Sequence, residues 1–229
     1  MPAALLLVYS ETGAAVPTEE FNDWYDNEHV PLSVPIPSFH SWSRWVAADD
    51  KQPSYLALYD IDSPAAVNDI PHASFSNRDK SMLGRLPLVE LRTYTLHEPV
   101  HSPKAGTSYS ASAPGPFISS VAMDIPDEHV ADFDKWYDEE HIPLISKTSG
   151  WVRTRRFVFT DRTVLGTEAE RLSLSPHKFL TLHEWESPAA LASEEYKAAI
   201  STPLTLKFKG LATRFEPRLF ELHKSWDRE

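Results

Sequence analysis

The stretch FNDWYDNEHVPL at 21–32 returns as FDKWYDEEHIPL at 133–144, with few changes. Both copies keep the same mixture of aromatic rings, acids, one histidine and a closing proline. A constant offset of 112 residues relates Phe21 to Phe133, Trp24 to Trp136, His29 to His141 and Arg44 to Arg156. The chain is therefore an internal duplication, whose halves we call the first and second repeats.

The offset grows further along the chain. YLALYDIDSPAA at 55–66 matches FLTLHEWESPAA at 179–190, so the second repeat has gained about 12 residues. They fall in TDRTVLGTEAERLSLSPH at 160–177, a polar insertion that either covers a pocket or is simply a flexible exposed loop.

The composition of 99–116 marks it as a linker, because PVHSPKAGTSYSASAPGP is rich in Pro, Ser, Gly and Ala. We therefore predict a first unit at 1–98, a linker at 99–116 and a second unit at 117–229. Each half is long enough to bury a core.

Each repeat has the pattern strand, helix, strand, strand, helix, strand. Short apolar, β-prone stretches begin the repeats, and Thr18 and Asp127 stand where helices would begin. A hairpin follows, and Ser63–Pro64 and Ser187–Pro188 predict the start of the second helix. The order βαββαβ predicts an α+β fold of two ferredoxin-like units. Each sheet has one bare face, so we expect the sheets to pack together as a pseudo-dimeric α/β barrel.

The net charge of −11 disfavours nucleic acids and anionic membranes as partners. Cysteine is absent, which excludes disulfides and thiolate chemistry. No apolar run reaches the length of a membrane span and the N-terminus lacks a signal-peptide pattern, so we expect a cytoplasmic protein. No phosphate-binding loop or nucleophile elbow occurs.

The doubled FNDWYDNEHVPL motif resembles the first-helix signature of EthD-like proteins of the dimeric α/β-barrel superfamily, in the duplicated fungal form. The resemblance implies the barrel fold and a monomeric pseudo-dimer or a homodimer. It also implies an aromatic or polyketide-like small molecule as ligand. Relatives include cofactor-free cyclases, decarboxylases, isomerases and oxygenases, besides haem peroxidases and proteins of unknown role.

The motif allows a chemical and a structural interpretation. His29 lies one helical turn from Tyr25 and Asp26, either of which could orient its ring as a general base. Glu28 is predicted to lie among the rings, with Arg44 as its partner. A histidine before Pro also suits the end of a helix, and a feature needed by the fold must occur in both repeats. No metal-binding spacing is present, so we expect no metal site. We also expect no cofactor, although the resemblance leaves haem as an alternative.

A pocket between helices and sheet would gather Tyr25, His29, His40, Trp42 and Arg44 in the first repeat. The alternative places Trp42 and His40 in the core. His141, Tyr137 and Arg156 are the corresponding candidates in the second repeat. Our candidates for catalysis are His29, His40 and His141, and those for substrate binding are Tyr25, Trp42, Arg44, Tyr137 and Arg156. His72 is expected on the surface.

Three functions fit these candidates. The first is a cofactor-free lyase or cyclase, including a decarboxylase, that uses histidine acid/base chemistry on an aromatic or polyketide-like compound. The second is a cofactor-free oxygenase of a phenolic or anthrone-like substrate. The third is a small-molecule-binding or scaffold protein without catalysis.

Overall fold

Two compact units make up the computed structural model, which describes residues 2–101, 114–173 and 175–227. The first unit consists of Met1–Leu96, Phe159–Pro176 and Leu222–Glu229, and the second of His97–Val158 and His177–Glu221. The first unit therefore combines the first repeat with two stretches of the second. Most of the predicted linker at 99–116 lies outside the described residues, and the three sequence boundaries stay a prediction.

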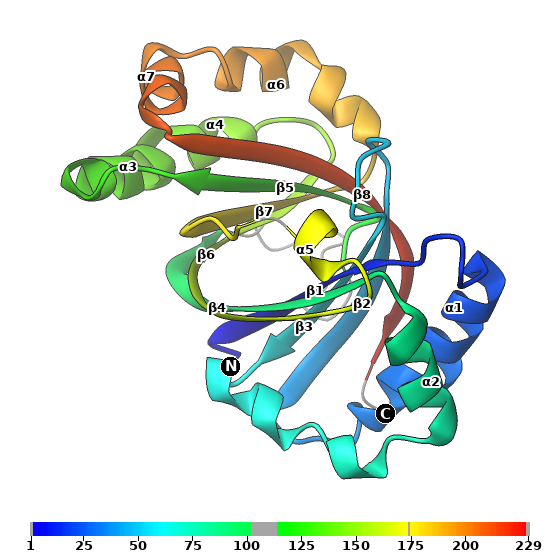
Figure 1. Ribbon diagram of the computed structural model, residues 1–229. Helices are drawn as coiled ribbons and strands as arrows, with labels where there is room; N and C mark the ends of the chain where they lie inside the picture. The colour runs from blue at the N-terminus through cyan, green and yellow to red at the C-terminus, as the bar shows by residue number, and fades with distance from the viewer. Residues whose placement is uncertain (1, 102–113, 174, 228–229) are drawn as a thin grey trace. The chain divides into compact units, whose positions relative to one another are not determined.

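The first repeat follows the predicted order of strands and helices. Its elements are β1 (Ala4–Glu11), α1 (Thr18–Trp24), a π-helical turn (Tyr25–His29), a 3-10 turn (Val30–Leu32), β2 (Phe39–Ala47), β3 (Tyr55–Ile61), 3-10 turns (Pro64–Asp69 and His72–Ser74), α2 (Asn77–Arg85) and β4 (Leu88–His101). Strand β1 lies between β3 and β4, antiparallel to both. Helices α1 and α2 lie side by side (Figure 1).

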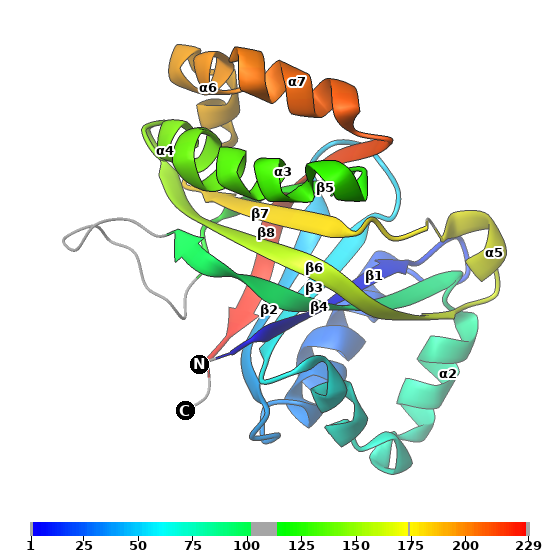
Figure 2. The same ribbon diagram turned by 90° about the vertical axis from the view of Figure 1, so that its left-hand side faces the viewer.

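The second repeat has the same order with additions. Its elements are β5 (Phe117–Asp124), a 3-10 turn (Asp127–His129), α3 (Val130–Trp136), a π-helical turn (Tyr137–His141), α4 (Ile142–Ile145), β6 (Trp151–Leu165), α5 (Ala169–Leu172), β7 (Phe179–Trp185), a 3-10 turn (Pro188–Ala192), α6 (Glu194–Ala199), α7 (Pro203–Leu211) and β8 (Arg214–Trp226). Helix α7 packs on α3 (Figure 2).

The eight strands form a closed barrel in the order β1-β3-β2-β8-β5-β7-β6-β4. The predicted α+β fold of duplicated ferredoxin-like units in an α/β barrel is therefore confirmed. In the described residues, no helix is long and apolar enough to cross a membrane.

The start of the second helix was predicted wrongly. Ser63–Pro64 opens only a 3-10 turn, and α2 begins at Asn77, after a capping box in which Ser76 and Asp79 bond each other's backbone N–H groups. This box satisfies two N–H groups that a helix start leaves unpaired, so it fixes the beginning of α2. The position of Asp79 follows from it.

The motif itself ends α1 with a π-helical turn, which the sequence did not reveal. The backbone N–H of Val30 bonds the carbonyl of Tyr25, five residues back. The wider turn places His29 beneath Trp24, with 4.7 Å between the ring centroids, and Trp136 and His141 repeat this at 4.5 Å. Such turns are frequent at functional sites.

Candidate functional site

A cavity of about 170 Å³ lies in the first unit, between the π-helical turn, α2 and the sheet. Most of its lining is apolar: Leu6, Val8, Trp24, Leu32, Phe39, Ile70, Phe75, Leu83, Leu86, Val89, Leu91 and Leu165. The polar lining residues are Ser10, Tyr25, His29, Ser33, Tyr59 and His72. None of these residues is a Lys, Arg, Asp or Glu, so the walls carry no permanent charge.

His29 is the best-placed base in this lining. Its Nδ1 lies 3.2 Å from Oδ1 of Asp79, and its side chain is 22% exposed while that of Asp79 is 1% exposed. A carboxylate can only accept here, so the neutral ring keeps its proton on Nδ1. Nε2 then carries the free lone pair that a general base needs.

Asp79 is held as a carboxylate by several donors. Trp24 Nε1 donates to Oδ1 at 2.9 Å, and the backbone N–H of Ser76 donates to Oδ2 at 3.1 Å. The hydrogen bond with His29, followed by those from Trp24 and Ser76, lowers the pKa of Asp79 to about 2 against the effect of burial. The negative charge beside His29 is therefore permanent at neutral pH.

Two tyrosines form a second polar pair in the lining. The hydroxyls of Tyr25 and Tyr59 lie 3.1 Å apart, and both side chains are buried. Burial raises the pKa of Tyr25 and raises that of Tyr59 well above its usual value. The pair therefore stays protonated and can donate a hydrogen bond to negative charge in the cavity.

Arg44 lies behind the site and does not line the cavity. It donates to Asp26 and, at 2.8 Å, to Asn22, and its guanidinium lies 4.3 Å from the ring centroid of Tyr25. The prediction that Arg44 pairs with Glu28 is wrong. The Glu28 side chain is partly exposed and contacts Ser76 and Arg78 instead.

The second repeat has the same framework without the carboxylate. Thr205 occupies the place of Asp79, and Thr202 that of Ser76, in an equivalent cap at the start of α7. His141 Nδ1 lies 3.5 Å from Thr205 Oγ1. Burial lowers the pKa of His141 to about 3, with a smaller contribution from His183, so it is neutral at pH 7.

Aromatic packing surrounds His141. Phe208 stacks on Trp136 at 5.0 Å, where α2 of the first repeat has the smaller Met82. The hydroxyl of Tyr137 accepts a hydrogen bond from Thr181 at 3.2 Å. Arg156 repeats the role of Arg44: it binds Asp134 and lies 4.3 Å from the Tyr137 ring.

The structure brings together only part of the predicted first-repeat pocket. Tyr25 and His29 line the cavity, whereas Trp42 is 1% exposed in the core cluster of the unit. His40 is exposed and its Nε2 lies 2.6 Å from Oδ1 of Asp62. A register shift in β2 between Phe39 and Ser41 breaks the alternation that would have placed His40 beside Trp42.

Four residues of the site were not identified from the sequence: Asp79, Tyr59, His72 and Leu165. Asp79 had a signal, because SNRD at 76–79 has the spacing of a capping box. His72 is exposed, as predicted, but it also lines the cavity.

Haem does not fit this cavity. The volume of the cavity lies below the roughly 300–1,000 Å³ of usual ligand pockets, and the cavity lining has no Lys or Arg to pair with the propionate groups of haem. Among the described residues, no group of three or more His, Asp or Glu is arranged to hold a metal ion.

Comparison with known proteins identifies the fold. No protein-family model matches the chain, and no curated protein does. A solved structure of an anthrone oxidase-like protein aligns with a TM-score of 0.65 and 10% identity, covering 100% of this chain and 94% of that chain. A protein from Lactobacillus acidophilus, provisionally named a monooxygenase, aligns with a TM-score of 0.59 and 11% identity, covering 99% and 97%.

A third structure, provisionally named a chlorite dismutase, aligns with a TM-score of 0.60 and 12% identity, covering 97% of this chain and 95% of that chain. Identities this low establish a shared fold and not a shared activity. The three agree on the dimeric α/β-barrel architecture. Membership of the narrower EthD-like group stays a prediction.

Proposed function

We propose that this protein is a cofactor-free oxygenase of a small, uncharged phenolic or anthrone-like compound, with His29 as its general base. The observation that carries this proposal is that His29, oriented by the buried carboxylate of Asp79, lines an apolar cavity. This assignment favours the second of the three functions considered from the sequence. The names of the oxidase-like and monooxygenase-like structures of similar fold support it.

The first step is removal of a proton from the substrate by Nε2 of His29. The proton comes from a phenolic O–H or from a C–H group activated by neighbouring rings. Asp79 stabilises the imidazolium that forms, because its carboxylate accepts the Nδ1–H bond throughout. The substrate is left as an electron-rich anion.

The pair of tyrosines, Tyr25 and Tyr59, can stabilise that anion. A hydroxyl of Tyr25 or Tyr59 can donate to the oxygen on which the negative charge develops, in a cavity whose apolar walls strengthen the interaction.

Dioxygen then reacts with the anion. For an anthrone-like CH₂ group, the carbanion adds O₂ to form a C–O bond, and His29 returns its proton to the peroxide. Loss of the second hydrogen and cleavage of the O–O bond give a carbonyl and one water. Two C–H bonds are thus broken and four electrons pass from substrate to O₂, which balances without a cofactor.

The size and charge of the cavity define the substrate class. An apolar cavity of about 150 Å³ takes up benzene, so the 170 Å³ here suits one or two rings, with the rest of a larger compound at the opening. The lining has no Lys or Arg to pair with a carboxylate. This disfavours a decarboxylase, whose substrate is an acid. The aromatic or polyketide-like ligand and the cytoplasmic location expected from the sequence remain part of this proposal.

Oxygen consumption tests the proposal. Anthrone is incubated with the wild type in an oxygen electrode, the rate without enzyme is subtracted, and the product is identified by mass spectrometry. We expect oxygen uptake that His29→Ala removes and His40→Ala retains, since His40 lies outside the cavity. Product formation under argon would instead indicate a lyase or cyclase, and binding without any product would indicate a binding protein.

A further inference from the structure

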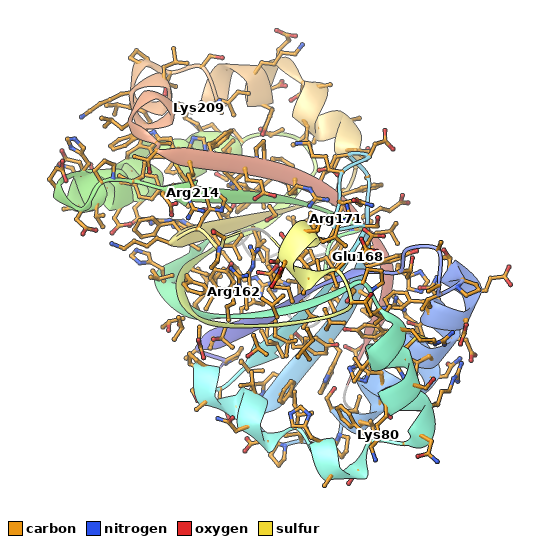
Figure 3. The ribbon with its side chains drawn as sticks, viewed as in Figure 1. Lys80, Arg162, Glu168, Arg171, Lys209 and Arg214 are labelled. Carbon is orange, nitrogen blue, oxygen red and sulfur yellow. The ribbon has the colours of Figure 1, made fainter. Side chains whose placement is uncertain are left out.

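The insertion of the second repeat belongs to the first unit. Residues Phe159–Pro176 are assigned to that unit, although they belong to the second repeat in sequence. They include the end of β6 and the short helix α5, which Glu168 and Arg171 mark in Figure 3. The first repeat lacks about 12 of these residues, so the insertion is an asymmetric addition to one cavity.

Backbone contacts fix the insertion at the start of β4. Thr167 N–H donates to the carbonyl of Leu86 at 3.1 Å, and Glu168 N–H donates to that of Pro87 at 2.9 Å. Gly166 between β6 and these bonds has a φ of +127°, and a Cβ there would lie 2.3 Å from the Pro87 oxygen. Only glycine allows this approach.

Leu165, the residue before this anchor, lines the cavity. Leu165 is 49% exposed, whereas the deep lining residues Leu6, Trp24 and Phe39 are at most 2% exposed. Leu165 therefore lies at the opening, where it covers part of the cavity.

We infer that Leu165, held by the Gly166 anchor, is a specificity-determining residue that sets how far an aromatic ligand extends out of the first-unit cavity. The ligand class is an uncharged aromatic of two or more rings: the first ring occupies the deep part and the next contacts Leu165. This inference concerns the site of the proposed function and names the residue that limits the length of its ligand. It requires only that the cavity binds such aromatic ligands.

Calorimetric titration with phenol and 1-naphthol tests this without relying on turnover. Phenol probes the deep part, and 1-naphthol also reaches the opening. In Leu165→Ala we expect the dissociation constant of 1-naphthol to rise about tenfold, because an apolar contact of this size is worth that much selectivity. The value for phenol should stay within about twofold.

Two further variants complete the design. Leu206→Ala is the matched control, because Leu206 is 57% exposed on α7 and does not line the cavity. Gly166→Ala should reproduce the loss for 1-naphthol by displacing the anchor, with thermal unfolding checked first. If Gly166→Ala does not fold, the two leucine variants still decide the question.

The outcomes separate the two proposals. Unchanged binding of both ligands by Leu165→Ala overturns the role of Leu165 and leaves the proposed oxygenase standing. Equal weakening of phenol and 1-naphthol also overturns it, because Leu165 would then support the whole cavity. Failure of the wild type to bind either ligand overturns both proposals.

Discussion

Nδ1 of His29 lies 3.2 Å from a carboxylate oxygen of Asp79, whereas Nδ1 of His141 lies 3.5 Å from the hydroxyl of Thr205. The two histidines occupy the same place in duplicated motifs and differ in this one partner. A carboxylate fixes the tautomer of His29 and stabilises its charged form; a hydroxyl does neither to a comparable degree. The difference makes the first repeat the one suited to proton transfer.

Asp79→Asn should lower kcat on the order of 10²-fold while KM changes little, since an amide can donate to Nδ1 and place the proton on Nε2. The measurement is steady-state oxygen uptake at pH 7.5. Ser76 stays the N-cap, and the oxygen of the new amide can still accept from the backbone N–H of Ser76, so α2 should persist. Thr205→Val in the second repeat is the matched control and should retain full kcat. An unchanged kcat in Asp79→Asn would show that His29 does not depend on this carboxylate.

Tyr59→Phe should lower kcat on the order of 10²-fold, because it removes a donor to the developing negative charge. Its hydroxyl lies 3.1 Å from that of Tyr25 inside the cavity. Stopped-flow kinetics under single turnover would separate this effect from binding, which should change little. A large rise in KM with unaltered kcat would assign Tyr59 to binding alone.

Arg44→Met and Arg156→Met should each destabilise the fold by about 3 kcal/mol, because each removes one partner of a buried ion pair. The two side chains are 3% and 4% exposed; Arg44 pairs with Asp26, and Arg156 pairs with Asp134 and, at 3.5 Å, with Asp138, the counterpart of Asp26. Urea denaturation gives the free energies of unfolding. The sequence proposed both arginines as substrate-binding residues; loss of 1-naphthol binding in Arg44→Met at unchanged stability would support that role instead.

Acid should destabilise the protein through two buried histidines. Burial lowers the pKa of both His141 and His183 to about 3, against 6.5 in the unfolded chain. Between these values the unfolded chain binds more protons, so the free energy of unfolding falls as the pH drops below 6.5, by about 1.4 kcal/mol per pH unit for each group. The contribution of the two neutral, buried histidines to stability is fully present above pH 6.5.

Denaturation curves at pH 7.5, 6 and 5 measure this slope. His183→Leu should remove about half of it, whereas His40→Ala should not, because His40 is exposed. A slope that is identical in wild type and His183→Leu would mean that folding does not lower the pKa of His183.

The sequence predicted the barrel because alternating apolar residues indicate local structure, and the duplication shows that the same order of strands and helices occurs twice in the chain. It predicted Tyr25 and His29 for the same reason, since both lie on one short motif. Asp79 was missed because it lies 50 residues from His29 in the chain. Their contact depends on where α2 begins, and a weaker start signal at Ser63 was followed instead of the capping box at Ser76.

His40 shows a different limit. Strict alternation along β2 places it on the face of Trp42 and Arg44, but the register shift after Phe39 turns it outward. Such a bulge depends on the pairing with β3 and leaves no composition signal. Leu165 could not be placed at all, because the position of an insertion follows from the backbone it packs against.

The first unit is assembled from three separated stretches of chain, and this governs how the protein can be divided. A fragment ending near the linker would lack Leu165 at the opening and Trp226, which packs against the core of the unit. Neither half of the chain is therefore expected to bind the ligand when it is expressed alone. Cutting the chain at 99–116 should instead yield a split protein, whose two fragments regain ligand binding only when they are mixed or co-expressed.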